Sequence, residues 1–126
     1  MNTITRDALK AKLDRHEPLQ LVMALGRWAW EQARIPGSLN FATYTDALAR
    51  LSKDEEVVVY CTNPSCPASY RLYHYLKSQG FTRVSRYSGG IEEWAEAGLP
   101  VEGKQAARYP TPVAPRLTAQ FAWSPA

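Results

Sequence analysis

The chain has two cysteines, Cys61 and Cys66, and both lie in one short segment, VVVYCTNPSCPAS. A run of β-branched residues ends at Tyr60, Cys61 follows at once, and the pattern predicts a helix from about Pro67. Open α/β sheets bind ligands outside the carboxyl ends of their strands, where helices begin. The first turn of a helix stabilises a thiolate, which lowers the pKa of the thiol and raises its nucleophilic fraction. The segment therefore predicts a nucleophilic thiol, and the same N–H groups can hold an anion delivered to it.

The two cysteines differ in their position relative to the predicted helix. Cys61 directly follows the strand and the loop can wrap around its sulfur, whereas Cys66 adjoins the helix and feels its dipole more strongly. We predict that Cys61 is the nucleophile and Cys66 a resolving or relaying thiol, with the reverse order as the alternative. The four residues between them allow a disulfide if the loop permits. The competing interpretations are a buried apolar role for Cys61 and a plain loop role for Cys66.

The polar groups around the cysteines are the candidate binding groups for an anionic donor. The backbone N–H groups of residues 62–66 form the predicted cradle, except at Pro64, which has none. The candidate binding residues of the loop and the helix start are Thr62, Asn63, Ser65, Ala68 and Ser69.

Two arginines are further candidates for that role. Arg71 lies about one turn into the helix, and Arg34 precedes the turn Ile35-Pro36-Gly37, although either position is more often a solvated surface residue. The two cysteines, with His16 and His74 far away, do not supply four ligands at zinc spacing, so no metal site is expected.

Helical and strand patterns alternate along the first hundred residues. Strands are expected at 19–24, 39–41, 55–60 and 81–87, and helices after Thr5, at 27–33, around 47–51, at 67–79 and at 91–97. Strands separated by helices predict a parallel sheet with helices on both faces.

Length and charge limit the classes of protein that fit. With 126 residues the chain forms one domain and has no room for a separate cofactor domain. No stretch approaches the roughly 20 apolar residues of a membrane span, and the start lacks a signal-peptide core, so a cytoplasmic protein without membrane contact is expected. All 12 acidic residues lie within residues 1–103, balanced there by 12 of the 15 basic residues. The net charge of +3 therefore belongs to the remainder, and no basic stripe for nucleic acid is evident.

We divide the chain into a domain at residues 1–103 and a Pro-rich basic tail at residues 104–126. The tail carries four of the nine prolines, and its apolar residues include Leu117, Phe121 and Trp123. These are too many apolar groups for a purely solvating segment, so the tail is expected to pack on its own domain or on a neighbouring subunit, or to be partly disordered.

From Ile4 to Gly103 the sequence resembles the rhodanese-like family, the single-domain sulfurtransferases. The stretches that carry the resemblance are RIPGSLNF, VVVYC, SQGFTRVSRYSGGIEEW and AGLPV, in the family's order. The resemblance implies a three-layer α/β fold with a central parallel five-stranded sheet and helices on both faces. It also implies that Cys61 accepts sulfane sulfur as a persulfide, from thiosulfate or another persulfide. Cyanide, a thiol or a protein then removes that sulfur, with no cofactor, in a monomer or homodimer.

The sequence departs from the family pattern at several positions. If Ser69 is the family's helix-starting serine, the loop is two residues longer than usual and holds a second cysteine. The chain thus resembles a subgroup with a C-x4-C loop followed by Ala-Ser. The Asp and Arg of the first buried strand are replaced by Met23 and Leu25, and the histidine before Ile-Pro-Gly by Arg34.

Two other functions were weighed against sulfur transfer. A related phosphatase or arsenate reductase needs an arginine six residues after its cysteine, where this chain has Pro67 or Leu72. A non-catalytic redox-sensing or binding module that uses the Cys61/Cys66 pair remains the main alternative to the sulfurtransferase.

Overall fold

A parallel sheet of three strands forms the centre of the structure, a computed structural model that describes residues 1–106. The strands follow the order β1-β2-β3, so β2 is paired on both sides; for example, Leu21 of β1 pairs with Val58, which in turn pairs with Ser85 of β3. The elements in chain order are α1 (Arg6–Asp14), β1 (Leu19–Met23), α2 (Arg27–Gln32), α3 (Tyr44–Arg50), β2 (Glu56–Tyr60), α4 (Pro67–Ser78), β3 (Val84–Tyr87) and α5 (Gly90–Glu96).

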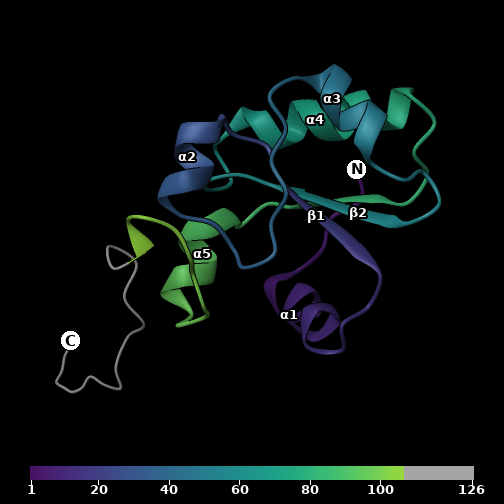
Figure 1. Ribbon diagram of the computed structural model, residues 1–126. Coiled ribbons are helices and arrows are strands. Elements are labelled where there is room, and N and C mark those ends of the chain that lie inside the picture. Colours follow the sequence, from purple (N-terminus) through teal and green to yellow (C-terminus); the bar gives the residue numbers. More distant parts are fainter. Residues whose placement is uncertain (107–126) are drawn as a thin grey trace, which may run out of the picture.

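Helices cover both faces of this sheet, as predicted (Figure 1). Successive side chains of a strand point to opposite faces, and β2 therefore serves two cores. Val57 and Val59 pack with residues of α3 and α4, whereas Val58 and Tyr60 pack with residues of α1 and α5. All four side chains are fully buried. The β-branched run of β2 is thus explained by burial on both sides, which requires apolar side chains at every position.

The predicted number of five strands is not confirmed: the described residues form three strands, and two flanking segments pair through one residue each. Thr3 joins the sheet beside Arg86 of β3, and Leu39 joins it beside Val22 of β1, each through a single parallel bridge. Five segments therefore lie side by side, but only three of them form ladders among the described residues.

Asn40 explains why pairing beside β1 stops after one residue. Its side-chain amide donates to the carbonyl oxygens of Met23 (3.2 Å) and Leu25 (2.7 Å). The side chain of Asn40 thus takes carbonyl groups that a longer strand would bind through its backbone.

The third strand begins at Val84, later than the predicted start at Phe81. The backbone N–H of Phe81 donates to the carbonyl of Leu76 in α4 (3.1 Å), and Gly80 has the left-handed φ of 94°. This is the arrangement that ends a helix and satisfies its last carbonyls. Phe81 therefore belongs to the helix end, although its side chain is buried in the core.

The last described residues lie against α2. The N–H groups of Lys104 and Gln105 donate to the carbonyls of Glu31 (2.9 Å) and Gln32 (2.7 Å) at the end of that helix. The predicted packing of the rest of the tail falls on residues 107–126, outside the described residues. Within residues 1–106 no helix is long and apolar enough to span a bilayer.

Candidate active site

The loop that holds both cysteines connects the carboxyl end of β2 to α4. Cys61 follows Tyr60 directly, and Cys66 is the N-cap residue of α4, with Pro67 at the first helical position. Pro favours that position because its fixed φ suits a helix and its missing N–H is not needed there. The predicted strand, loop and helix start are confirmed.

Asn63 shapes the inside of the loop. Its carbonyl accepts the N–H of Cys66 (3.1 Å), and its side-chain oxygen accepts the N–H of Ser65 (3.0 Å). These two N–H groups therefore already have partners within the loop. Of the predicted cradle at residues 62–66, the N–H of Thr62 faces the sulfur of Cys66 and Pro64 has no N–H, which leaves the N–H of Asn63 for a ligand.

The start of α5 fixes the other side of the loop. The N–H of Ile91 donates to the carbonyl of Cys61 (2.9 Å), and the N–H of Glu92 donates to the carbonyl of Thr62 (3.0 Å). The side chain of Asn63 adds a contact to the carboxylate of Glu92 (3.4 Å). The first N–H groups of α5 thus bind the loop backbone and determine where the thiol of Cys61 lies.

Cys61 is almost completely buried at the floor of the loop. Its thiol donates to Oγ of Ser69 (3.3 Å) and lies 3.5 Å from the carbonyl oxygen of Cys66. Burial raises the pKa of the Cys61 thiol, and the neighbouring Cys66 raises it further, whereas Ser69 lowers it in part. Cys61 alone is therefore a poor thiolate in this geometry.

Cys66 is half-buried and titrates in the opposite direction. Partial burial acts to raise the pKa of Cys66, but this is outweighed by the neighbouring Cys61 thiol, the N–H groups of Ala68 and Thr62, and the positive charge of Arg86. The net effect is a lowered pKa. The opposite directions of the two shifts favour Cys66 as the thiol of the pair that ionises first.

Arg86 belongs to this site and was missed by the sequence analysis. Its Nε donates to Oγ of Ser69 (2.8 Å), and its Nη2 donates to the carbonyl oxygens of Pro64 (3.2 Å) and Cys66 (3.3 Å). The alternation of β3 carries a signal: Val84 and Arg86 share a face of the strand, and Val84 points into the core beneath α4. A charge on that face near the strand end must find partners in the cysteine loop.

The other candidate residues fall into two groups. Thr62, Asn63, Ser65, Ala68 and Ser69 lie in the loop or the first turn of α4, next to the two thiols. Arg71 lies on the exposed side of α4. Arg34 donates to the carboxylate of Glu102 (3.1 Å) and the carbonyl of Trp30 (3.0 Å), so the structure does not bring it to the cysteines. The roles of these residues stay predictions.

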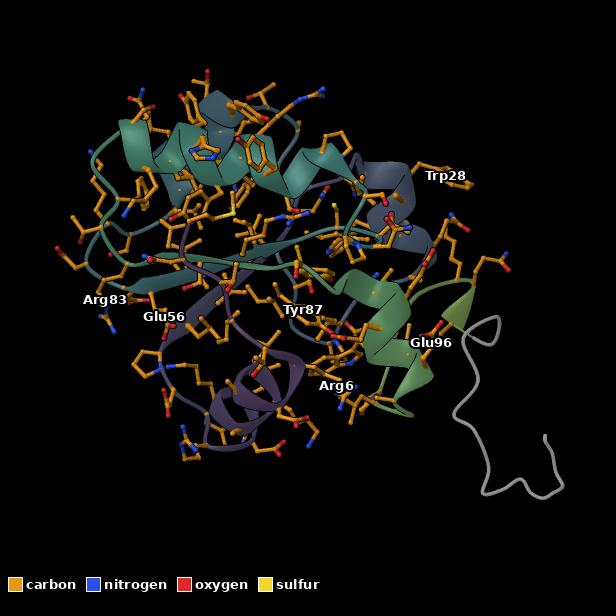
Figure 2. The ribbon with its side chains drawn as sticks, turned by 180° about the vertical axis from the view of Figure 1, so that it is seen from behind. Arg6, Trp28, Glu56, Arg83, Tyr87 and Glu96 are labelled. Atoms are coloured by element: carbon orange, nitrogen blue, oxygen red, sulfur yellow. The ribbon has the colours of Figure 1, made fainter. Side chains whose placement is uncertain are left out.

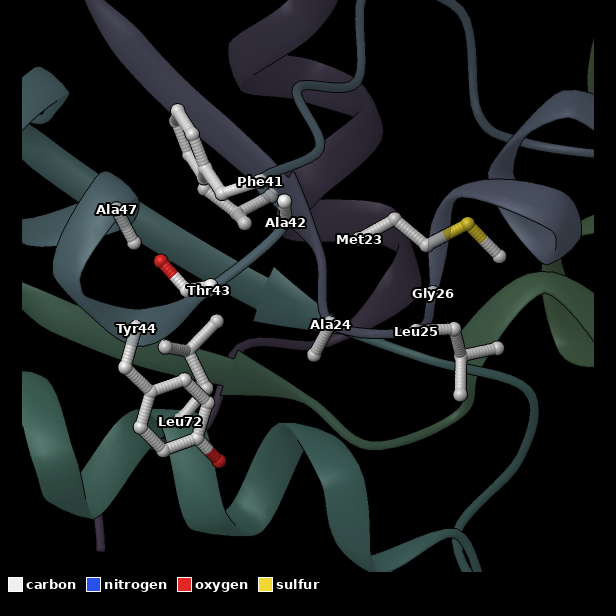
Figure 3. A pocket seen from close by; sticks show the side chains of 11 residues that line it. Met23, Ala24, Leu25, Gly26, Phe41, Ala42, Thr43, Tyr44, Ala47 and Leu72 are labelled. Carbon is white, nitrogen blue, oxygen red and sulfur yellow. The ribbon is translucent and has the colours of Figure 1, made fainter.

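Two hollows lie near the loop. A cavity of about 130 Å³ at the carboxyl end of β1 has mainly apolar walls, which include Ala24, Leu25, Phe41, Thr43, Tyr44 and Leu72 (Figure 3). A larger hollow of about 530 Å³ is lined by Leu25, Trp28, Gln32 and Ile91, and it reaches the cysteine loop at Thr62. Trp28 is 74% exposed and projects outward beside the larger hollow (Figure 2). The larger hollow thus borders the cysteine loop at Thr62 and leaves room there for a small molecule.

Residues 1–106 contain no cluster of three or more His, Cys, Asp or Glu that could hold a metal ion.

The arrangement can carry out sulfur exchange chemistry. One thiol of the pair holds a proton that the other can accept, and a hydroxyl group and backbone N–H groups face the sulfurs. A nucleophile with an adjacent base is the general arrangement of covalent catalysis.

Several of the curated proteins similar to this chain are named as sulfurtransferases. The chain is 32% identical over 103 residues to a sulfurtransferase from Allochromatium vinosum, a match that covers 80% of this chain and 94% of that protein. It is 30% identical over 76 residues to the thiosulfate sulfurtransferase GlpE from Actinobacillus pleuropneumoniae, which covers 60% of this chain and 68% of that protein.

A solved structure and a protein family also match this chain. A crystal structure of a protein from Bacillus halodurans is similar with a TM-score of 0.78 and 25% identity, covering 85% of this chain and 80% of that one. The family described as "Rhodanese-like domain" matches residues 5–97, which include the three strands, both cysteines and Arg86. The chain therefore belongs to the rhodanese-like domain family.

Proposed function

We propose that this protein is a sulfurtransferase in which Cys61 takes up sulfane sulfur as a persulfide. The Cys61 thiolate attacks the outer sulfur of thiosulfate, the S–S bond of thiosulfate breaks, and sulfite leaves with the electron pair. A persulfide donor reacts in the same way and leaves as a thiolate. Cyanide or an acceptor thiol, free or on a protein, then attacks the outer sulfur of the persulfide and regenerates the Cys61 thiolate.

The position of the Cys61 thiol, in contact with Oγ of Ser69 and beside Cys66 at the start of α4, is the observation that carries this proposal. Cys66 is the more acidic thiol of the two, since its pKa is lowered while that of Cys61 is raised. Cys66 can therefore accept the proton of Cys61 as Cys61 attacks the donor, and Ser69 then stabilises the new thiolate. In this mechanism Cys66 is the base for Cys61.

Mass spectrometry after thiosulfate treatment tests the proposal. We expect the wild-type protein to gain the mass of one sulfur atom, Cys66→Ser to gain it more slowly, and Cys61→Ser to gain none. The double variant, which has no thiol, is the control for sulfur held elsewhere. Sulfur uptake by Cys61→Ser but not by Cys66→Ser would reverse the roles of the two cysteines, and no uptake by the wild type would reject the sulfurtransferase.

A redox-sensing module is the second candidate, and the proximity of Cys61 and Cys66 favours it. Oxidation of the reduced protein by hydrogen peroxide would convert one thiol to a sulfenic acid, and the other would displace water to form the disulfide. Rapid formation of this disulfide in a protein that takes no sulfur from thiosulfate, polysulfide or persulfide donors would favour the sensor.

A further inference from the structure

Arg86 and Cys61 direct hydrogen-bond donors at the same two oxygen atoms. Oγ of Ser69 accepts from Nε of Arg86 (2.8 Å) and from the thiol of Cys61 (3.3 Å). The carbonyl oxygen of Cys66 lies 3.3 Å from Nη2 of Arg86 and 3.5 Å from the sulfur of Cys61. The guanidinium of Arg86 and the buried thiol of Cys61 therefore share two partners, the hydroxyl of Ser69 and the carbonyl of Cys66.

The hydrogen-bonding capacity of each group determines what happens when Cys61 ionises. A guanidinium only donates, so the Arg86–Ser69 contact always uses a lone pair of the serine oxygen and leaves its proton free. A thiolate only accepts, so the Ser69–Cys61 contact must then run from the hydroxyl to the sulfur. Arg86 thus favours the rotamer of Ser69 in which the hydroxyl proton faces the sulfur of Cys61. The hydrogen bonds then run from Arg86 to Ser69 and from Ser69 to Cys61.

We propose that Arg86 is a positioning residue of the cysteine loop, which orients the hydroxyl of Ser69 toward the sulfur of Cys61 and holds the carbonyls of Pro64 and Cys66 in place. The inference rests on the proposed function to the extent that Cys61 is the sulfur-carrying thiol. It assigns to β3 a part in the site that the two cysteines alone do not show.

The backbone places Arg86 firmly enough for this role. Its N–H donates to the carbonyl of Asn2 (2.9 Å), and its carbonyl accepts the N–H of Ile4 (3.1 Å), so Arg86 is held from the edge of the sheet. Its side chain points to the face that α4 covers, where Ser69 is 1% exposed. A side chain held at both ends has little freedom to leave the loop.

The positive charge of Arg86 also acts on Cys66, where it contributes to the lowered pKa of that thiol. The other charged or titratable groups that face the pair are the thiols themselves and Glu92 of α5, which contacts the loop through Asn63. From α4 the pair meets the uncharged hydroxyl of Ser69. Within residues 1–106, Arg86 is therefore a cation whose charge acts on Cys66 and whose contact with Ser69 leads to Cys61.

Titration of the Cys61 thiolate by its ultraviolet absorbance tests the proposal without a sulfur donor. The measurement uses the Cys66→Ser protein, in which Cys61 is the remaining thiol, and adds Arg86→Gln, Ser69→Ala or both. We expect each single change to raise the pKa of Cys61 and to lower its thiolate fraction at neutral pH about tenfold, the effect of about one pKa unit. The double change should lower the fraction no further than Ser69→Ala alone, because both act through one hydroxyl group.

Arg83→Gln is the matched control. Arg83 directly precedes β3, at the end of the strand opposite to Tyr87 (Figure 2), and it donates to the carbonyl of Asp54. It should leave the titration unchanged. If Arg86→Gln does not fold, Arg86→Lys replaces it in the same cycle. An unchanged titration in the Arg86 variant, or effects of Arg86 and Ser69 that multiply, overturns the positioning role.

The outcome is separate from that of the proposed function. A protein that takes up no sulfur can still show the coupling of Arg86 and Ser69, and a working sulfurtransferase can lack it.

Discussion

Gly90 lies directly against the backbone of Thr62. A Cβ atom on Gly90 would lie 2.5 Å from both the carbonyl carbon and the carbonyl oxygen of Thr62, and 2.6 Å from the carbonyl oxygen of Cys61. Gly90 also has a φ of 69°, in the region that side chains rarely adopt. The close approach allows the next two N–H groups, those of Ile91 and Glu92, to hold the loop.

Gly90→Ala should therefore both destabilise the protein and displace the loop. We expect a loss of unfolding free energy on the order of 4 kcal/mol, because the backbone must shift, together with loss of sulfur uptake. Gly37→Ala is the matched control: its φ is 85°, but nothing lies within 4 Å of its added Cβ. Strain alone should cost that variant about 1–2 kcal/mol. Equal losses in urea unfolding would show that contact with Thr62 is unimportant.

The two thiols should differ in reactivity. The pKa of Cys66 is lowered and that of Cys61 is raised, and alkylation requires the thiolate, so Cys66 should react at lower pH than a free cysteine does. Peptide mapping after a pulse of iodoacetamide at several pH values measures both rates. In Cys66→Ser the Cys61 midpoint should move down, because the neighbouring thiolate that raised it is gone. Faster labelling of Cys61 than Cys66 at neutral pH contradicts this order.

The cysteine loop can be located from the sequence because its signals are local. The β-branched run, the turn-rich loop and Pro67 each specify their own backbone, and the structure has the strand and helix there. By contrast, the sequence around Gly90 does not show its contact with the backbone of Thr62, which lies far away in the sequence. Such contacts depend on how the elements pack, which a local pattern does not contain.

The contacts of Arg86 and the shortness of the two flanking segments also depend on how the elements pack, so a local sequence pattern does not show them. A single arginine in a strand could face solvent, and only the approach of α4 shows that it reaches Ser69. The flanking segments at Thr3 and Leu39 form one bridge each, so the structure has three of the five strands that the resemblance implied. Asn40 ends the pairing through its side chain, which no periodicity rule for strands anticipates.

The hydroxyl of Tyr60 ties the turn before Leu39 to the strand that carries Cys61. It accepts the N–H of Ile35 (3.0 Å) and shares a hydrogen bond with Oγ of Ser38 (2.6 Å), and burial raises the pKa of Tyr60 to about 12. Tyr60→Phe leaves a buried N–H without its partner and should cost about 1–3 kcal/mol of unfolding free energy. Tyr44→Phe, at a side chain that is 42% exposed, serves as the control in the same thermal melts. A Tyr60 variant as stable as this control would mean that water or another group replaces the hydroxyl.

Two shortened chains test the boundary after Gly103. A chain that ends at Ala106 keeps the N–H groups of Lys104 and Gln105 on the last carbonyls of α2, whereas a chain that ends at Gly103 loses both. We expect the shorter chain to be less stable by about 2 kcal/mol, from two hydrogen bonds of about 1 kcal/mol each. Comparison of the full chain with the one ending at Ala106 then reports on residues 107–126 alone. Identical melting of the two shortened chains would place the boundary at Gly103, as the sequence suggested.

The place of β2 between two strands and two cores has a consequence for how the protein opens. Residues 57–60 are fully buried, and neighbouring strands pair with them on both sides. Their amide protons can therefore reach solvent only when both cores separate, so they should exchange at the rate of global unfolding. The N–H groups of Ser65 and Cys66 in the cysteine loop have their partners within the loop, and the carbonyls of Cys61 and Thr62 accept N–H groups from the start of α5. We therefore expect Cys61 to lie at the border between the slowest-exchanging part of the described chain and a loop that can fluctuate on its own without loosening the sheet beneath it.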